Sequence, residues 1–367
     1  MTNDLLYQLA LTTIPNIGAV HAKILLQHYN VKDIFKTKIS ELEKLEGIGT
    51  IRAKSIKEFH DFTKAEEEIL FIEKYRIKPL FITDKEYPQR FRNCYDPPTM
   101  LFYKGTADLN ASKMIGIVGT RNNTNYGKQS TEKLVKDLAL QNVVIVSGLA
   151  FGIDTIAHKA SIKNNLPTVG ALGHGLDTIY PAENTGLAKD MIKHNGGLIT
   201  EFFSKTKPDK HNFPQRNRIV AGLCDATIII ETNIKGGSMI TAELANGYNR
   251  DVFAIPGKIT DSKSSGTNYL IQNNKAILLT DAEELITIMG WEEKKQKPKS
   301  KFQKELFIEL SAEEKIILTI LNEKETVHID EINLKSGLTS SAVAAAILNL
   351  ELQGVILSFP GKIYKLA

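Results

Sequence analysis

The chain has 367 residues, of which 42% are hydrophobic and 24% charged, so it can form two or three domains around at least one large core. This composition excludes wholesale disorder. The formal net charge of +4 is too small to indicate nucleic-acid binding by itself. No segment approaches the roughly 20 apolar residues that a membrane span needs, and no secretory signal is expected. Two cysteines and eight scattered histidines suggest neither a disulfide framework nor a metal site, so we expect a cytoplasmic protein.

Residues 1–80 are predicted to form a helical domain with a short internal repeat. Ile14–Leu25 and Leu45–Ile56 align, and each places a lysine one turn after a glycine turn. This pattern resembles the helix-hairpin-helix, whose backbone N–H groups can contact a phosphate without reading bases. The alternative is a packing module whose glycines only permit the turns. The first copy has Asn16 where the second has Gly47.

Residues 81–290 are predicted to form a Rossmann-like α/β domain. After an irregular lead-in, apolar strand patterns alternate with amphipathic helical stretches, which implies crossover connections and a mostly parallel sheet with helices on both faces. The expected strands are 114–118, 143–146, 168–172, 198–200, 226–230, 252–255 and 276–279. Ligands of such sheets bind at the carboxyl ends of the strands, so the functional residues are expected in the loops that follow them.

The stretch from Val143 to Ser161 is the clearest of these strand-to-helix units. A run of β-branched residues ends at Ser147, a corner containing Gly148 and Gly152 follows, and helical spacing begins at about Asp154. A glycine corner of this kind leaves backbone N–H groups free at the helix start, where an anion is also favoured. Phosphate binding and a simple tight corner are both compatible with the pattern.

Four loops of this domain combine glycines with basic side chains. They include GTRNNTNYG from Gly119, the Gly148 corner, KHNFPQRNR from Lys210, and KGGSMITAE from Lys235. Five lysines and arginines and a single acid lie between residues 205 and 218, with Phe213 among them. An unpaired strand needs a positive groove for its backbone and a flat side chain on which bases stack. The loops therefore favour binding of single-stranded nucleic acid. The alternative is that these residues have a structural role, with Phe213 in the core and the arginines paired with acidic side chains.

The enzyme patterns fit less well. The phosphate loop of ATPases needs four residues between its glycine and Gly-Lys, and here seven separate Gly119 from Gly127. The dinucleotide fingerprint is missing from the strand ends. KGGSMITAE does resemble the loop of nucleotide phosphoribohydrolases, with Glu243 in the place of their acid. An acidic side chain near a helix N-terminus is the simpler interpretation of Glu243.

The C-terminal part is predicted to contain a lysine-rich linker and a winged helix. Residues 291–310 hold six lysines between 294 and 304, which is typical of a solvated linker. Residues 311–367 predict three helices and a hairpin. The third helix, at about 339–354, contains no lysine or arginine, so it lacks the side chains that usually contact DNA in the major groove. We therefore expect it to contact protein.

Several motifs resemble the bacterial DNA-processing protein (DprA, or Smf) family. They are VGTR at 118–121, SGLAFGIDTIAHKAS at 147–161, GHGLDTIYPAEN at 173–184, NFPQRNRIVAGL at 212–223 and GGSMITAELA at 236–245. The resemblance implies a homodimer that binds single-stranded DNA and loads the RecA recombinase during natural transformation, with no catalysis, cofactor or metal. It implies a DNA site formed by Gly119, Arg121, Ser147, Gly148, Lys159, Lys210, Phe213, Arg216, Arg218, Gly236, Gly237 and Ser238.

Overall fold

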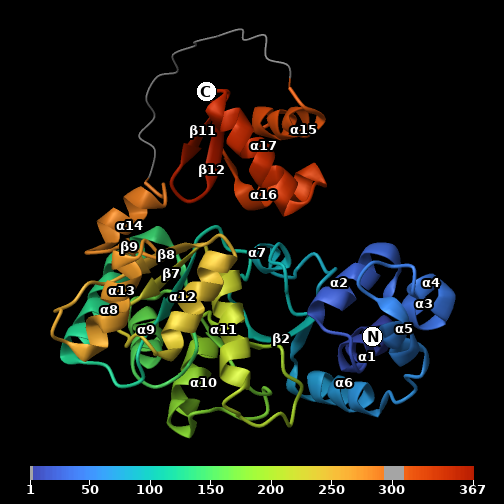
Figure 1. Ribbon diagram of the computed structural model, residues 1–367. Helices are drawn as coiled ribbons and strands as arrows, with labels where there is room; N and C mark the ends of the chain where they lie inside the picture. The colour runs from blue at the N-terminus through green and yellow to red at the C-terminus, as the bar shows by residue number, and fades with distance from the viewer. Residues whose placement is uncertain (1–2, 293–309) are drawn as a thin grey trace. The chain divides into compact units, whose positions relative to one another are not determined.

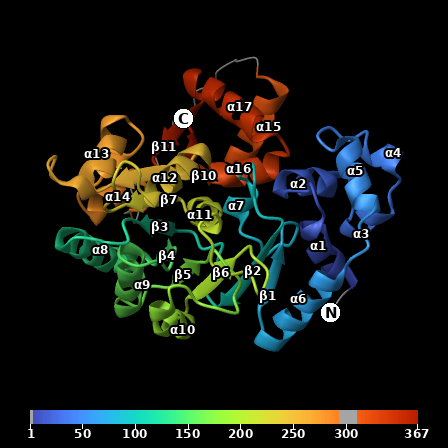
Figure 2. The ribbon, with the colours of Figure 1, turned by 60° about the horizontal axis from the view of Figure 1, so that its bottom comes forward.

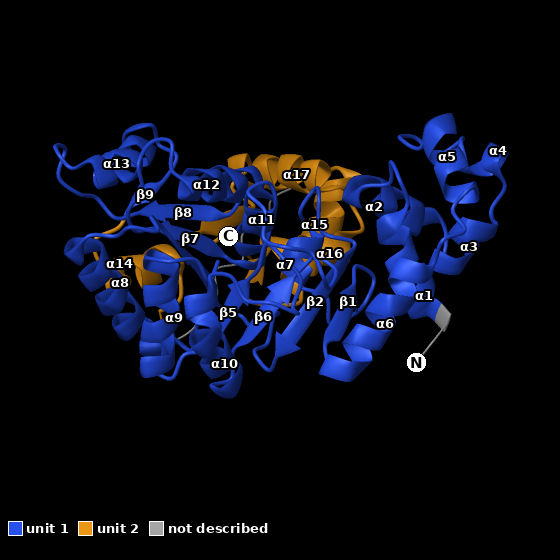
Figure 3. Ribbon diagram, turned by 90° about the horizontal axis from the view of Figure 1, so that it is seen from below, with its two compact units in different colours: residues 1–278 blue, residues 279–367 orange. Residues whose placement is uncertain are grey.

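The computed structural model describes residues 3–292 and 310–367. The chain divides after Leu278 into two compact units, which Figure 3 colours separately. The first unit contains the predicted helical and Rossmann-like parts. The second contains the winged helix. Most of the predicted linker at 291–310 lies outside the described residues.

The N-terminal part is helical, as predicted, and both glycine turns are formed (Figure 1). In the second copy Gly47 has a φ of +85°, and in the first copy Asn16 reaches +66°. Asparagine tolerates this left-handed region better than most residues, so the missing glycine does not prevent the first turn. The helices are α1 (Asn3–Thr13), α2 (Ala19–His28), α3 (Val31–Lys36), α4 (Ile39–Leu42), α5 (Gly49–Lys57) and α6 (Thr63–Tyr75).

The centre of the first unit is a nine-stranded sheet with the order β1-β2-β6-β5-β4-β3-β7-β8-β9. All pairs are parallel except those of β2, which is antiparallel to both β1 and β6. Strand β3 is buried at every position, as expected where helices cover both faces. The strands are β1 (Lys78–Phe81), β2 (Met100–Gly105), β3 (Met114–Val118), β4 (Val144–Ser147), β5 (Thr168–Ala171), β6 (Gly197–Thr200), β7 (Ala226–Ile229), β8 (Asp251–Ala254) and β9 (Ile277–Leu278).

Helices lie on both faces of this sheet, which confirms the predicted Rossmann-like architecture. Helices α8 (Asn125–Asp137), α9 (Ile153–Lys163) and α10 (Thr185–Lys193) cover one face, and α11 (Asn212–Leu223) and α12 (Gly237–Gly247) cover the other (Figure 2). The chain builds β3 to β6 in one direction and then returns to β7 on the other side of β3. The switch point between β3 and β7 is where such sheets bind ligands.

The remaining elements of this unit are short. They are α7 (Gln89–Arg92), α13 (Ser265–Gln272) and the 3-10 turns at Leu138–Gln141, Ala182–Asn184 and Ser262–Ser264. Strand β1 crosses the expected domain boundary between residues 80 and 81 and pairs with β2. The lead-in is therefore part of the sheet.

The second unit begins with α14, which falls within the range predicted for the Rossmann-like domain, and residues 310–367 then have the predicted order of three helices followed by a hairpin. Its elements are α14 (Ala282–Ile288), α15 (Ala312–Asn322), β10 (Val327–His328), α16 (Ile329–Ser336), α17 (Ser340–Leu352), β11 (Ile356–Phe359) and β12 (Ile363–Leu366). Strand β10, which the sequence pattern did not indicate, pairs with β12. A separate apolar core includes Ile317, Ile332, Val343 and Leu350. None of the described helices is long and apolar enough to span a membrane.

Candidate nucleic-acid interface

A cavity of about 750 Å³ opens at the switch point of the sheet. The loop after β3 forms one wall with Gly119 and Arg121, and the start of α12 forms another with Gly236–Ser238. The start of α11 contributes a third, which includes Lys210 and Phe213. All three segments lie at the carboxyl ends of the parallel strands, so the topology itself brings them together.

The structure brings eight of the twelve predicted site residues to this cavity. They are Gly119, Arg121, Lys210, Phe213, Arg216, Gly236, Gly237 and Ser238. Ser147, Gly148, Lys159 and Arg218 do not line it.

Arg121, Phe213 and Tyr180 form a flat aromatic and cationic surface in the cavity. The guanidinium carbon of Arg121 lies 5.3 Å from the centre of the Phe213 ring. The Tyr180 ring lies 5.7 Å from the Phe213 ring, with 31° between the planes. Tyr180 is 45% exposed, so part of its ring remains accessible beside Phe213. Such a surface can stack bases without selecting among them. The sequence analysis missed Tyr180, although it belongs to the GHGLDTIYPAEN motif.

Arg216 lies at the floor of the cavity and is only 5% exposed. Its Nη1 donates to the Ala171 carbonyl at 3.1 Å, and its Nε has no partner among the residues that the structure describes. Burial lowers the pKa of Arg216, and the nearby Asp154 carboxylate opposes that shift. A Cβ on Gly148 would lie 1.7 Å from Nη1. Gly148 therefore leaves room for the guanidinium.

The donors of the Gly148 corner are already used within the chain, which corrects the expectation that they are free. The N–H groups of Gly148 and Ala150 donate to Asp154 Oδ2 at 3.1 and 3.3 Å. Ser147 is buried, and its hydroxyl donates to the Ile117 carbonyl at 2.6 Å. Burial raises the pKa of Asp154, and Arg216 opposes that shift. The start of α9 thus carries its own carboxylate instead of an exposed anion site.

The start of α8 is also occupied by a carboxylate of the chain itself. Glu231, which is buried after β7, accepts a hydrogen bond from the Thr124 N–H at 2.9 Å. Helix α12 differs because it begins at Gly236 with no side-chain cap. Ser238, in its first turn, is buried, and its Oγ has no partner among the described residues. An uncapped helix start facing a cavity favours an anion such as a phosphate.

Arg218 and Lys159 lie away from this cavity. Arg218 forms ion pairs with Glu201 and, at 3.3 Å, with Asp96. Burial alone would lower the pKa of Arg218, but these two carboxylates raise it above its ordinary value. The structural alternative, an arginine paired with acids, therefore describes Arg218. Lys159 is exposed on α9.

Glu243, the acid of the phosphoribohydrolase interpretation, does not line the cavity. Glu243 is exposed in the second turn of α12. It therefore does not lie in the first turn, where an acidic side chain would stabilise the helix N-terminus. Among the described residues there is no group of three or more His, Cys, Asp or Glu side chains that could hold a metal ion.

Comparisons with known proteins give matches to successive parts of the chain. Residues 78–290 match the family model for DNA recombination-mediator protein A, 306–362 match the DprA winged helix domain, and 6–69 match the helix-hairpin-helix motif. Protein Smf of Synechocystis is 31% identical over 98% of both chains. The crystal structure of Streptococcus pneumoniae DprA superposes with a TM-score of 0.60 at 32% identity, covering 78% of this chain and 97% of that one.

A second solved structure is that of Helicobacter pylori DprA, described for its single-stranded DNA binding mode. It has a TM-score of 0.52 at 33% identity, covering 58% of this chain and 94% of that one. Because the central model alone spans more than half of the 367 residues, and the Smf match runs from end to end, this chain belongs to the DprA (Smf) family of DNA-processing proteins.

Proposed function

We propose that this protein binds single-stranded DNA in the cavity at the switch point. The observation that carries the proposal is the convergence there of Arg121, Phe213 and Arg216 beside the uncapped start of α12. A relative of 33% identity, from Helicobacter pylori, has been described in terms of its binding of single-stranded DNA. Binding of this kind requires no cofactor and no bond cleavage.

The chemistry of the cavity accounts for weak sequence preference. Arg121 and Lys210 are exposed and neutralise backbone phosphates, which are the same in every strand. Phe213 and Tyr180 offer ring faces, and every base has a face that can stack on them. The buried Arg216 fixes a positive charge beneath this surface.

The test is fluorescence anisotropy with labelled deoxythymidine oligonucleotides at several salt concentrations. Arg121→Ala should weaken binding and reduce the slope of log affinity against log salt by about 0.7, the value for one phosphate contact on a single strand. Phe213→Ala should weaken binding by about 1–3 kcal/mol with the slope unchanged, because it removes stacking and no charge. Wild-type affinity in both variants would refute the proposed site.

Two exposed lysines serve as comparisons in the same assay. Lys133→Ala, on the outer side of α8, is the matched control and should bind as wild type. Lys159→Ala tests the one predicted basic contact that lies on α9. We expect little change, because Lys159 does not line the cavity. A shallower salt slope for Lys159→Ala would instead extend the path of the strand across α9.

The proposal includes the finer roles that family membership implies, namely dimerisation and the loading of RecA onto the bound strand. A strand held by its phosphates and stacked bases leaves other surfaces of the protein available to a recombinase. Light scattering after size exclusion measures the mass and should give twice that of one chain. Assembly of RecA on a strand coated with single-strand-binding protein should be faster with wild type than with Arg121→Ala. Equal rates would contradict the loading role while leaving DNA binding intact.

A further inference from the structure

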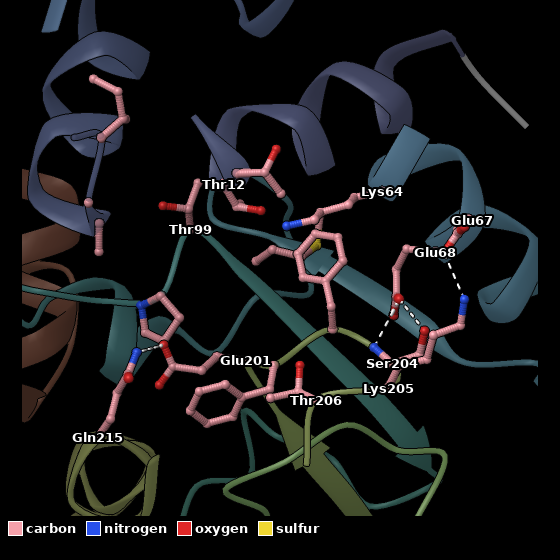
Figure 4. A pocket seen from close by; sticks show the side chains of 18 of the residues that line it. Thr12, Lys64, Glu67, Glu68, Thr99, Glu201, Ser204, Lys205, Thr206 and Gln215 are labelled. Atoms are coloured by element: carbon pink, nitrogen blue, oxygen red, sulfur yellow. Dashed lines mark hydrogen bonds and ion pairs between the residues drawn. The ribbon is translucent and has the colours of Figure 1, made fainter. Parts of the chain in front are cut away.

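A second cavity, of about 550 Å³, lies between the helical domain and the sheet (Figure 4). One side is lined by the end of α1, the start of α2 and the first turns of α6, which contribute Thr12, Ile17–Ala19 and Lys64. The other side consists of Thr99 before β2 and the segment after β6. Nothing in the proposed function uses this cavity.

The two cavities share a wall. On α11, Gln215 and Arg218 face the second cavity, whereas Arg216 and Asn217 face the first. The segment that precedes α11 also borders both, because 204–206 line the second cavity and 208–210 line the first. The α11 residues belong to the first two turns of that helix, which is roughly 10–12 Å wide with its side chains. A strand leaving the first cavity over the start of α11 therefore reaches the second.

Most charges in the second cavity are already matched. Glu67 pairs with Lys205 at 2.8 Å. Glu68 is buried and accepts hydrogen bonds from the N–H and hydroxyl of Ser204 at 2.9 and 2.6 Å. Arg218 pairs with the carboxylate of Glu201. Figure 4 shows the contacts of Glu67 with Lys205 and of Glu68 with Ser204, and the Lys64 side chain on the same side of the cavity.

The groups that stay open are those that a nucleotide needs. Lys64 is exposed, and it forms no hydrogen bond or salt bridge with any residue that the structure describes. Its charge interacts only through space with the exposed Asp61 carboxylate, so its ammonium can still contact a phosphate. Thr99 is 7% exposed, and its hydroxyl has no hydrogen-bond partner within the described ranges. Gln215 donates to Glu201 at 3.0 Å through its amide nitrogen, which leaves its carbonyl oxygen as an acceptor for a base edge.

The first helix-hairpin-helix copy also points toward this cavity. Ile17, Gly18 and Ala19 line it. The Gly18 N–H donates to His21 Nδ1 at 3.4 Å, and Gly18 has no side chain that could cap the next N–H groups of α2. Its lysine, Lys23, is turned the other way and donates to the carbonyls of Arg92 and Cys94, both at 3.1 Å. The hairpin is thus held against the sheet with its helix start directed at the cavity, where backbone N–H groups favour a phosphate.

We propose that this second cavity is a subsite for the same DNA strand and holds one nucleotide outside the first cavity. Lys64 and the start of α2 contact its phosphate. Thr99 and Gln215 contact the edge of its base, against the apolar wall of Ile17 and Met100. The volume lies within the usual range of about 300–1,000 Å³ for ligand sites. This inference rests on the proposed function.

The first test compares strand lengths within the range of about 4–16 nucleotides that single binding modules cover. Lys64→Ala should leave the affinity for the shortest oligonucleotide unchanged, because that strand fills only the first cavity. For the longest it should lower affinity several-fold and reduce the salt slope by about 0.7. Lys36→Ala, an exposed lysine on α3, is the matched control. Thr99→Val should weaken binding of the long strand with its salt slope unchanged.

The second test locates the strand directly by photocrosslinking. Phe202, in the segment after β6, lines the second cavity. Oligonucleotides with one 5-iododeoxyuridine, moved along a deoxythymidine chain, should crosslink to the peptide containing Phe213 at some positions and to that containing Phe202 at others. Wild-type binding of long strands by Lys64→Ala, with no crosslink to the Phe202 peptide, would overturn the subsite alone. Failure of the wild-type protein to bind any strand would overturn the proposed function as well, so the two failures are distinguishable.

Discussion

At the scale of single residues, Gly148 is required because two neighbouring side chains occupy the space that a Cβ would need. A Cβ at this position would meet Arg216 Nη1 at 1.7 Å and Asp154 Oδ2 at 2.6 Å. Both side chains are buried, so neither can move aside without leaving a charge poorly solvated. The same two groups line the cavity at the switch point. Under the proposed function, the glycine would therefore affect DNA binding through the position of Arg216.

We expect Gly148→Ala to reduce the free energy of unfolding by about 1–3 kcal/mol, since an added methyl group overpacks a filled site. It should also weaken binding of a deoxythymidine oligonucleotide, because Arg216 is displaced. Urea unfolding and anisotropy measure the two effects. Gly186→Ala, in the first turn of α10, is the matched control, because nothing lies within 4 Å of its added Cβ. Similar stabilities of the two variants would show that position 148 has more room than the contacts indicate.

At the scale of elements, the starts of the helices decide which loops can bind an anion. The starts of α8 and α9 are occupied by Glu231 and Asp154, which come from the chain itself. Each carboxylate satisfies backbone donors that a phosphate would otherwise use. The starts of α11 and α12, which also border this cavity, have no side-chain cap. Under the proposed function, this arrangement would let a Rossmann-like sheet without a dinucleotide fingerprint accept a phosphate.

The same elements show which features of the fold and of the candidate site could be predicted from the sequence. The strands were predictable because buried parallel strands are continuous β-branched runs, and the site followed because their carboxyl ends meet at one edge. The pairing of individual charges was not predictable. Arg218 pairs with Asp96, 122 positions away, and no local pattern encodes that contact. Strands β1 and β10 were missed because runs of a few residues carry little periodicity.

The contact between α9 and β5 predicts a dependence of stability on pH. His158 is fully buried on α9, its Nδ1 lies 2.7 Å from Thr168 Oγ1, and burial lowers its pKa to about 3. In the unfolded chain His158 has its ordinary pKa of about 6.5 and is protonated below that pH, whereas in the folded chain it stays neutral. The free energy of unfolding therefore falls as the pH drops from about 6.5 towards 3. Between pH 7.5 and 5.5 this loss amounts to about 1.4 kcal/mol.

The difference in unfolding free energy between wild type and His158→Asn should therefore shrink by that amount over the same range, because asparagine does not titrate. Urea unfolding at the two pH values measures it. A constant difference between wild type and His158→Asn would mean that the pKa of His158 is the same in the folded and the unfolded protein.

At the scale of the whole molecule, the chain has separate cores for its two compact units. The winged-helix core around Ile332 and Val343 shares no residue with the core of the first unit. The residues that line both cavities all belong to the first unit. Folding of the winged helix and binding of DNA in the cavities should thus be separable.

Differential scanning calorimetry should resolve two transitions, and the larger heat should belong to the larger unit, because unfolding enthalpy scales with residue number. Ile332→Ala removes a fully buried side chain from the winged helix, and Ile145→Ala removes one from the sheet. Each should cost about 2–5 kcal/mol and lower the Tm of its own transition alone. Ile332→Ala should bind oligonucleotides as wild type, even above the Tm of its winged helix. A single transition displaced by both substitutions would mean that the two units unfold as one.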